Sequence, residues 1–600
     1  MLTSCIKNEG KKPRLYIDGK LTPAMAYTTY FEERSCYKDF VEMGYRIFFV
    51  NLSFTKKPIN NMTGFTPFRI GAFEDPDNPD YSEFENAVER ILKKCPDAII
   101  FPRIYVSMPS RWTKDHTNDV ILASRGGYRE ILFSKAFRED AEKMLVSTVR
   151  HIKKANYSDR IGGWQICGGN TQEWFHHDMQ GSLCPSAETP FREWVSEIYG
   201  DNEAVLPNTD DFQYHGISVQ RSESARRYSE FCNAEVAKTL DILAAAIKRE
   251  TEGKQVVGAF YGYSLESNYT VLFGTHAIYN LLDSKNLDFF SSPNAYTDNR
   301  AFGIDWGDMM PVGSLKLHEK LCFIECDIRT HLTAAVQEAR PGEYPDDIYR
   351  TEDGKSVWAG PPTKELSVKA LRKCFAHQIT NASAIWWFDM WGGWYDDPVL
   401  LSELKHMNNL YSVELTNEDT GPARDVVLFT DERGYANLYS NSPELGGIYE
   451  TRKAMGNIGT PYDIFAVEDA EKILGDYKAA IFPFPAPSKA GREAIRLCKK
   501  MGIPYLSASS EKSGFNENEI NTFLKENGIH LYSKTNDVVY IGNGYIGLHT
   551  LKGGTKTLYL PKHANVSIIF GTDQVDNAEN RLIFELQDNG TALFSIKFTN

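Results

Sequence analysis

The segment IGGWQICGGNTQEWFHHD, from Ile161 to Asp178, joins an apolar run to a polar loop rich in aromatic side chains. The run 161–167 is short, contains glycine and follows a helical pattern at 134–156. This order predicts a buried strand after a helix. A single carboxylate, Glu173, then stands among aromatic and amide side chains. A solvated surface glutamate needs no such neighbours, so the segment predicts a strand that delivers a functional carboxylate.

The same order of apolar run and helical pattern continues on both sides of this strand, from about residue 13 to residue 410. Such alternation favours parallel strands in βαβ units, and eight units predict a (β/α)8 TIM barrel with long loop insertions. An open doubly wound sheet is the alternative, weakened because no G-x-G-x-x-G follows the first strand. A helix is expected near 275–284. The expected strands are 23–30, 45–53, 98–107, 161–167, 255–263, 287–296, 320–327 and 383–394.

The rest of the chain changes pattern twice. Residues 411–512 restart the alternation of strands and helices, which predicts a smaller open α/β domain. Residues 513–600 alternate at period two with turn residues between the runs, which predicts a small antiparallel β domain. With residues 1–410 as the barrel, the chain of 600 residues is expected to form three domains.

Composition and charge exclude several classes of partner. The chain has 66 basic and 80 acidic residues, a net charge of −14, which disfavours nucleic acid and anionic lipid. No run of about 18 apolar residues predicts a membrane span, and no signal peptide is visible at the first residues. The ten cysteines are scattered, as is typical of reduced thiols. We therefore expect a cytoplasmic protein.

Two glutamates stand at the ends of predicted strands. In a TIM barrel the active site lies at the C-terminal ends of the strands. Glu173 follows strand four and Glu325 ends strand seven, so the two can face each other across the mouth. Glycosidic bond hydrolysis needs such a pair, because one carboxylic acid protonates the leaving oxygen while the other carboxylate attacks or stabilises the anomeric carbon. Trp174 and Phe175 are expected to raise the pKa of Glu173, and Arg329 and Arg103 to keep Glu325 ionised.

Other polar and aromatic residues follow the apolar runs at the same end of the barrel. Aromatic content is 12%, and flat aromatic faces are typical of sugar-binding clefts. The candidates for substrate contacts are Tyr27, Arg103, Asn170, Gln172, Trp174, Tyr261, Asn294, Tyr296, Arg329, Trp387, Asp389 and Trp391.

Several stretches carry a resemblance to a known group. SPNAYTDNR (292–300), FIECDIRTHL (323–332) and WWFDMWGGW (386–394) resemble barrel segments of clan A glycoside hydrolases, in particular the family 42 β-galactosidases or a divergent sister family. The stretch from 425 to 488 resembles their trimerization domain. The likeness implies that Glu173 is the acid/base and Glu325 the nucleophile of a retaining double displacement. It also implies a homotrimer, and no cofactor is expected.

One departure from that group concerns the residue before the acid/base. The group usually has Asn there, hydrogen-bonded to the substrate 2-hydroxyl, whereas this chain has Gln172. Asn170 is a second candidate for the contact.

Several readings of function stay open. The first is an exo-acting β-galactosidase-like enzyme for short β-linked oligosaccharides; a β-mannosidase or another β-glycosidase of the same mechanism is the next. A non-catalytic sugar-binding protein on a barrel scaffold is a further alternative. A metal-dependent hydrolase would use His176, His177, Asp178 or His331, but no H-x-H follows strand one, so no metal is expected.

Overall fold

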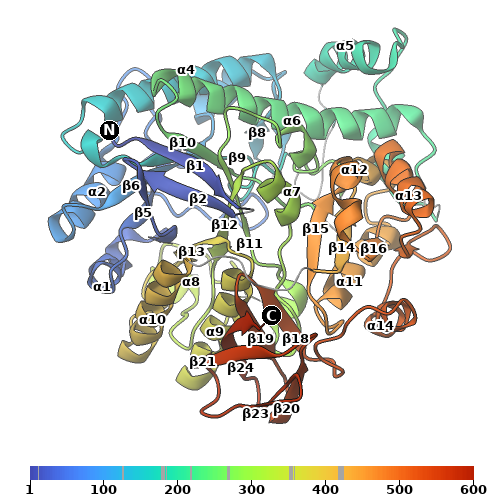
Figure 1. Cartoon of the computed structure of the whole chain (residues 1–600). Helices are drawn as coiled ribbons and strands as arrows, with labels where there is room; N and C mark the ends of the chain where they lie inside the picture. Colours follow the sequence, from blue (N-terminus) through green and yellow to red (C-terminus); the bar gives the residue numbers. More distant parts are fainter. Residues whose placement is uncertain are drawn as a thin grey trace.

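Eight parallel strands close into a barrel at the centre of the molecule (Figure 1). The computed structural model describes residues 1–10, 12–123, 127–176, 183, 185–216, 219–266, 270–350, 356, 358–416 and 424–599. Each barrel strand coincides with one of the eight apolar runs, with β9 extending one residue beyond its run, so the predicted TIM barrel is confirmed. In ring order they are β4 (Met25–Thr28), β5 (Ile47–Ser53), β6 (Ile99–Val106), β9 (Gly163–Gly168), β10 (Val256–Phe260), β11 (Phe289–Pro293), β12 (Leu321–Cys326) and β13 (Ala384–Phe388).

Large aromatic side chains fill the interior of the barrel. Phe49 of β5 packs against Phe101, Phe323 and Trp386, with ring centroids 5.0–5.1 Å apart. Phe289 lies 6.3 Å away on the opposite wall. Because side chains alternate between the two faces of a strand, every second residue of these runs points inward and the next one meets the helices. This alternation decides which strand-end residues reach the mouth.

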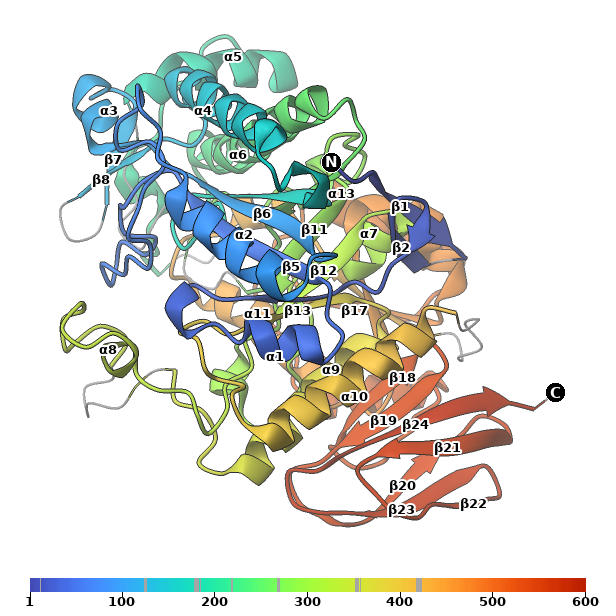
Figure 2. The same ribbon diagram turned by 90° about the vertical axis from the view of Figure 1, so that its left-hand side faces the viewer.

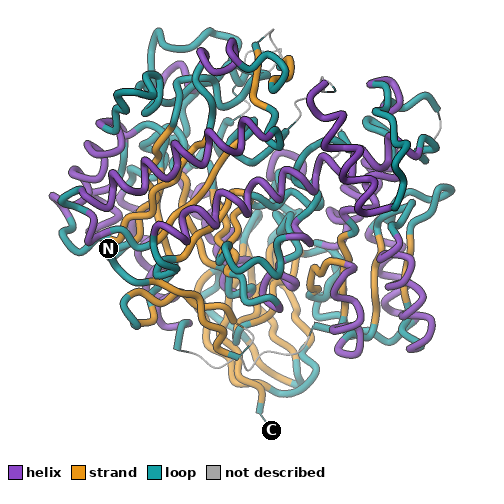
Figure 3. Tube along the Cα trace, turned by 90° about the horizontal axis from the view of Figure 1, so that it is seen from above, coloured by secondary structure: helices purple, strands orange, loops and turns teal. Residues whose placement is uncertain are grey.

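Helices cover the outside of the barrel, and the two longest cross the strands when the molecule is seen from above (Figure 3). Ser134 caps α4 by accepting a hydrogen bond from the Phe137 amide. The covering helices are α1 (Tyr37–Glu42), α2 (Ser82–Lys94), α4 (Lys135–Lys154), α6 (Glu223–Glu250), α7 (Val312–Leu317), α9 (Lys364–Thr380) and α10 (Pro398–Glu414). The loop insertions carry α3 (Ser110–Asp115), β7 (Val120–Leu122), β8 (Tyr128–Glu130), α5 (Glu188–Tyr199) and α8 (Val336–Ala339).

The helix expected near 275–284 is reduced to the 3-10 turn η6 (Ile278–Asn280), so that prediction is wrong. A segment from the next domain, η8 (Glu432–Asn437), packs there instead. The carboxylate of Glu432 accepts a hydrogen bond of 2.7 Å from the Ile278 amide, and Tyr435 stacks on His276 at 3.9 Å. These contacts replace the hydrogen bonds and packing that a longer helix would supply.

The first residues form an antiparallel hairpin that the sequence analysis did not predict. Strands β1 (Ser4–Glu9) and β2 (Lys12–Ile17), with the short β3 (Lys20–Leu21), lie against the start of β10. Arg14 is buried and makes an ion pair of 2.5 Å with Glu414 at the end of α10. Lys12 hydrogen-bonds Asn543 of the last domain. The hairpin thus ties both ends of the chain to the barrel.

Two four-stranded sheets follow the barrel, with the orders β15-β14-β16-β17, all parallel, and β18-β19-β24-β21, all antiparallel. A third sheet, β20-β23-β22, is antiparallel and has three strands. The second sheet packs on α9, as Figure 2 shows. The predicted domain limits at residues 410 and 512 remain predictions. The helix α10 continues past residue 410 and ends at Glu414. The parallel part contains β14 (Val426–Thr430), α11 (Pro443–Met455), β15 (Tyr462–Ala466), α12 (Ala470–Ile473), β16 (Ala479–Phe482), α13 (Lys489–Met501) and β17 (Tyr505–Ser507). The last part contains α14 (Glu517–Glu526), β18 (Val538–Gly542), β19 (Tyr545–His549), β20 (Gly554–Tyr559), β21 (Ala564–Phe570), β22 (Asp576–Ala578), β23 (Arg581–Leu586) and β24 (Thr591–Phe598).

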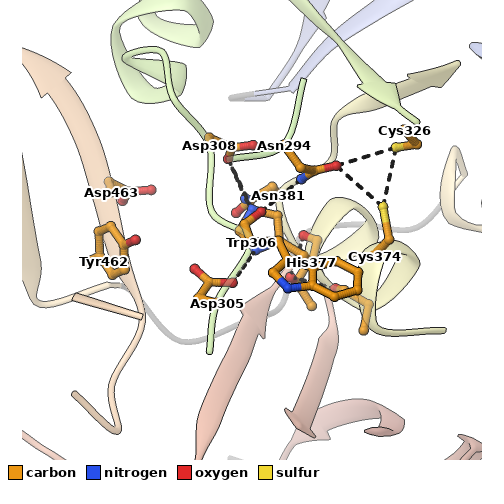
Figure 4. Close-up of polar contacts among 12 residues, drawn as sticks. Asn294, Asp305, Trp306, Asp308, Cys326, Cys374, His377, Asn381, Tyr462 and Asp463 are labelled. Atoms are coloured by element: carbon orange, nitrogen blue, oxygen red, sulfur yellow. Dashed lines mark hydrogen bonds and ion pairs between the residues drawn. The ribbon is translucent and has the colours of Figure 1, made fainter. Parts of the chain in front are cut away.

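A buried ionic cluster joins the barrel to the other two parts of the chain (Figure 4). His377 of α9 lies between two carboxylates, 3.5 Å from Asp305 and 3.3 Å from Asp308. Burial opposes its charge, but the two aspartates prevail and raise the pKa of His377 to about 10. Tyr462 and Tyr540 line the same cavity from the parallel and antiparallel parts. The imidazolium therefore neutralises buried acidic charge at the junction of all three.

Replacing His377 with Gln should destabilise the protein by roughly 3 kcal/mol at pH 6, because two buried carboxylates lose their cation. The raised pKa makes this contribution complete below about pH 6.5 and diminishes it as pH rises toward about 10. Thermal unfolding is followed by circular dichroism from pH 6 to pH 10. The difference in thermal midpoint between the variant and wild type should decrease as pH rises. His215→Gln, at a largely exposed histidine, is the matched control. A gap that does not change with pH would contradict a charged His377.

Candidate active site

The loop after strand four folds back on itself and returns Glu173 to the end of the strand. The Trp174 amide donates to the Gly168 carbonyl at 2.7 Å, and the Asn170 amide donates to the Phe175 carbonyl at 2.9 Å. These bonds set Glu173 beside Gly168, the last residue of β9. Although Glu173 comes five residues after the strand in sequence, its backbone lies at the strand tip.

This return requires unusual backbone angles. Three non-glycine residues of the loop have left-handed φ values: Thr171 at 57°, Gln172 at 74° and Trp174 at 63°. Such angles cost of order 1 kcal/mol each and persist only where the surroundings fix them. The buried indole of Trp174 packs beneath Gly168 and donates to the Ile166 carbonyl at 3.3 Å. A rigid packing of this kind holds the catalytic candidate in one position.

A second set of contacts fixes the loop from the neighbouring strand. Arg129 and Tyr105 both donate to the Gly169 carbonyl, at 2.7 Å and 3.0 Å. Gly169 itself has a φ of 67°, and a Cβ there would lie 2.7 Å from the Phe175 carbonyl oxygen. No other residue type fits without displacing the loop.

The carboxyl of Glu173 is held by two hydroxyl groups. Tyr263 donates to Oε1 at 2.6 Å, and Thr171 donates to Oε2. Burial raises the pKa of Glu173 to about 7, although both hydroxyl groups act in the opposite direction. Phe175 packs edge-on against Tyr263 at 4.8 Å and stacks on Phe273. A carboxyl that is half protonated near neutral pH suits a general acid.

Glu325 lies at the end of β12 and is 2% exposed. Its Oε2 atom is buried without a hydrogen-bond partner among the described residues. Burial, followed by the charge of Asp327, raises the pKa of Glu325 well above its usual range, while Arg103 and Arg300 oppose that shift. The charge of Glu173 also contributes, which places the two glutamates in one electrostatic pair. Arg329, expected to ionise Glu325, lies instead over the Trp358 ring at 4.4 Å.

Arg103 of β6 occupies the interior of the barrel beneath this pair. Its guanidinium is 1% exposed and donates to Gln172 at 2.5 Å and to Asn51 at 3.1 Å. The same oxygen of Gln172 also accepts a hydrogen bond of 2.8 Å from Tyr30. The side-chain NH2 of Gln172 makes no hydrogen bond within the described part of the chain. It is therefore the group of Gln172 that can meet a substrate hydroxyl.

Asn170 and Asp389, two of the predicted substrate contacts, have their side-chain oxygens engaged by the protein. Asn170 Oδ1 accepts a hydrogen bond of 2.9 Å from the Asn61 amide, which joins two loops of the mouth. Asp389 is fully buried and accepts from Tyr27 and from the Gly393 and Trp394 amides. Both residues hold loops in place. Trp174 is likewise buried beneath the strand end, so Trp174 and Asp389 are structural supports. The side-chain NH2 of Asn170 makes no hydrogen bond within the described residues, so Asn170 stays a candidate for a substrate contact.

Four more predicted contacts lie behind the barrel wall: Tyr27, Tyr261, Asn294 and Trp387. Trp386 points inward toward Arg103, so its neighbour Trp387 points outward and donates to Tyr45 at 2.9 Å. On the outer side of the barrel, Asn294 Oδ1 accepts a hydrogen bond of 3.4 Å from the Cys374 thiol (Figure 4). Tyr261 donates to the Gly274 carbonyl. The alternation of strand side chains removes these four from the set of substrate contacts.

Aromatic side chains from distant loops line the mouth, and most of them were missed from the sequence. Trp391, which was predicted, packs against Phe65 at 5.1 Å, Tyr349 at 5.9 Å and Trp358 at 6.5 Å. Burial raises the pKa of Tyr349, and the nearby charge of Glu173 adds to that rise. Tyr296, also predicted, donates to Asp327 at 3.3 Å. The missed residues belong to loops, where no strand pattern marks their direction.

Searches against protein-family models and against curated protein sequences give no match. The solved structures do. A β-galactosidase from Bacillus circulans sp. alkalophilus is 11% identical with a TM-score of 0.59, covering 96% of this chain and 98% of its own. A catalytic mutant of a GH42 β-galactosidase from G. stearothermophilus is 9% identical with a TM-score of 0.60 over both whole chains. An apo exo-carrageenase GH42 from Bacteroides ovatus is 12% identical with a TM-score of 0.57, covering 99% and 84%.

The fold is therefore that of the TIM-barrel glycoside hydrolases with additional C-terminal domains. Within that class the chain resembles the GH42 β-galactosidases, as the sequence predicted. Among the described residues no group of three or more His, Cys, Asp or Glu side chains is arranged to hold a metal ion. His177 and Asp178, weighed as ligands, lie outside the described residues. No helix in the described ranges is long and apolar enough to cross a bilayer.

Replacing Glu173 with Gln should stabilise the protein at pH 8 but not at pH 4. The folded-state pKa of about 7 lies above the ordinary value of 4.5, so wild type loses stability as pH rises between those values. The neutral amide avoids that loss. Thermal midpoints from pH 4 to pH 8 should show the variant gaining on wild type, while the exposed Glu319→Gln control shows no such trend. A constant difference would mean that Glu173 titrates normally.

Proposed function

We propose that the protein is a retaining β-glycosidase that acts from the end of short β-linked oligosaccharides. The observation that carries the proposal is the pair of carboxyl groups at the ends of strands four and seven, one of which has a pKa raised to about 7. Aromatic side chains of the loops at this end of the barrel, among them Tyr349 near Glu173, support a sugar as the substrate. The likeness to GH42 β-galactosidases makes a β-galactoside the first substrate, with a β-mannoside or another β-glycoside as the alternative.

In the first step Glu173 gives its proton to the glycosidic oxygen while Glu325 attacks the anomeric carbon. The bond from that carbon to the leaving oxygen breaks, and a covalent glycosyl ester forms on Glu325. In the second step Glu173, now a carboxylate, takes a proton from water, whose oxygen displaces Glu325. Retention of configuration follows from two inversions. The mechanism predicts carboxyl groups roughly 5–5.5 Å apart.

Burial raises the pKa of both carboxyl groups, and the charge of Asp327 adds to the rise at Glu325. Catalysis needs the proton on Glu173. Positive charge develops at the anomeric carbon in the oxocarbenium-like transition state, and it favours the ionised form of the carboxylate beside it. Arg103 acts in the same direction.

A non-catalytic sugar-binding protein is the alternative from a different class. It would keep the aromatic mouth but would not require two coupled carboxyl groups, one of them raised toward neutrality. Calorimetry that detects sugar binding by a wild type without turnover on any aryl glycoside would favour this alternative. The homotrimer likewise remains a prediction of the resemblance.

Removing either carboxyl should abolish most of the activity on 4-nitrophenyl β-glycosides. Glu173→Ala should lower kcat by roughly 10²–10⁴-fold. Added azide should restore turnover, because this anion attacks the glycosyl ester without needing a base. Glu325→Ala should reduce turnover to the detection limit, and azide should then give a product of inverted configuration. NMR of the first-formed sugar from wild type should show retention.

The control for these variants is the exposed Glu319→Gln, at the opposite end of strand seven. Full turnover by either alanine variant would refute the assignment of that residue. Inversion by the wild type would refute the double displacement.

Replacing Tyr263 with Phe should move the alkaline limb of the kcat/KM profile to higher pH. The Tyr263 hydroxyl donates to the carboxylate form of Glu173 and so lowers its pKa; without that bond the pKa rises. Because the acid must be protonated, activity then persists to higher pH. Tyr128→Phe, at an exposed tyrosine, should leave the profile unchanged. An alkaline limb that stays or moves downward would mean that another group sets it.

A further inference from the structure

A second cavity, of about 160 Å³, lies beside the loops that follow strands six and seven. Two arginines, Arg300 and Arg329, line it together with Asn299 and the rings of Phe302 and Trp306. One ordered water needs roughly 15 Å³ of such space, so the cavity can hold a group of several atoms. Neither step of the proposed mechanism uses it.

Arg300 is neutralised by the protein. Its guanidinium makes an ion pair of 2.5 Å with Asp327 and donates to the Asn294 carbonyl at 2.8 Å. Three successive residues, Asp298, Asn299 and Arg300, have left-handed φ values of 43°, 54° and 58°, which turn this segment toward the barrel. The negative charge of Asp327 is therefore balanced by Arg300.

Arg329 lacks such a partner. It is 8% exposed, and no carboxylate of a described residue lies within ion-pair distance of it. It donates to the neutral amide of Asn299 at 2.7 Å and lies over Trp358, while its Nε is buried without an acceptor among the described residues. Burial and the nearby Arg300 lower the pKa of Arg329 to about 10. Among the described residues, the two guanidinium groups at the cavity are therefore accompanied by one carboxylate, that of Asp327, which pairs with Arg300.

The walls keep this charge enclosed. A Cβ at Gly360 would lie 1.9 Å from the Thr330 carbonyl oxygen, so the 359–361 loop closes directly onto the loop after strand seven. Trp306 provides an apolar wall, and Lys373 lies on its ring at 3.7 Å. Buried charge without a counter-charge is costly, and an anion entering this space would relieve that cost.

The cavity shares residues with the carboxyl pair. Asp327 comes two residues after Glu325 and contacts Arg300. Tyr296 lies under the guanidinium of Arg300, 4.4 Å from ring centroid to Cζ. Burial and the charge of Asp327 raise its pKa, and the charges of Glu325 and Glu173 add to that rise. Asp327 and Tyr296 thus connect the carboxyl pair to Arg300 at the cavity.

We propose that this cavity receives an oxyanion carried by the sugar substrate, either a sulfate ester or a carboxylate, with Arg329 as its principal partner. The guanidinium fork of arginine matches both groups through paired hydrogen bonds. The inference rests on the proposed glycosidase function and narrows its substrates to acidic sugars.

The test combines a binding measurement with a selectivity measurement. Calorimetry with inorganic sulfate should show binding to wild type, weaker binding to Arg329→Lys and none to Arg329→Gln. Turnover is then compared on three 4-nitrophenyl β-galactosides: the neutral sugar, its 6-sulfate and the galacturonide. The ratio of kcat/KM for the preferred acidic sugar over the neutral one should fall roughly 10- to 100-fold in Arg329→Gln. Which acidic sugar is preferred distinguishes sulfate from carboxylate.

Arg111→Gln, at an arginine that is exposed on α3, is the control and should change neither measurement. Equal sulfate binding by wild type and Arg329→Gln, or an unchanged ratio, overturns the proposal. Glutamate-dependent hydrolysis without sulfate binding would retain the glycosidase and reject the oxyanion site. Sulfate binding lost in Arg329→Gln without turnover of any glycoside would reject the glycosidase and retain the site. Thermal midpoints of both Arg329 variants confirm that they are folded.

Discussion

The guanidinium of Arg103 is the buried charge on which the barrel mouth depends. Four aromatic rings surround it at 5.1–5.8 Å. Burial raises the pKa values of both glutamates, and the charge of Arg103 opposes that rise. An unpaired cation in an aromatic interior would be very costly, and so would two adjacent buried carboxylates. The buried cation lowers the free-energy cost of burying the carboxylates, and the carboxylates lower the cost of burying the cation. Because Arg103 also holds Gln172, the residue that balances the charge of Glu173 fixes its position as well.

The barrel could be predicted because its strands are continuous apolar runs between helices. This pattern depends on the type of residue along each run and not on the identity of any single residue. The directions of single side chains could not. Trp386 and Trp387 look alike in sequence, yet one faces Arg103 and the other faces Tyr45. A shift of one residue moves a side chain to the opposite face. Tyr261, beside the inward Phe260, was misplaced for the same reason.

The site shows a similar division between what local sequence carries and what it does not. Glu173 and Glu325 were marked by the strands before them. Tertiary packing of loops that are far apart in the chain brings together Phe65, Tyr349 and Trp358. Their spacing in the sequence therefore does not predict that they meet. Arg300, which balances Asp327, depends on a left-handed turn that its sequence does not reveal. Similarity of fold at 9–12% identity fits this picture, since a fold needs a pattern whereas a site needs particular contacts.

The hairpin at residues 4–17 bears on the order in which the molecule can assemble. Arg14 pairs with Glu414, and Lys12 hydrogen-bonds Asn543. Ribosomes release a chain from its N-terminus at roughly 5–20 residues per second. Lys12 therefore emerges about half a minute or more before its partner exists. Until then the hairpin lacks the hydrogen bond that joins it to the last domain, so this contact forms only after the barrel residues have been made.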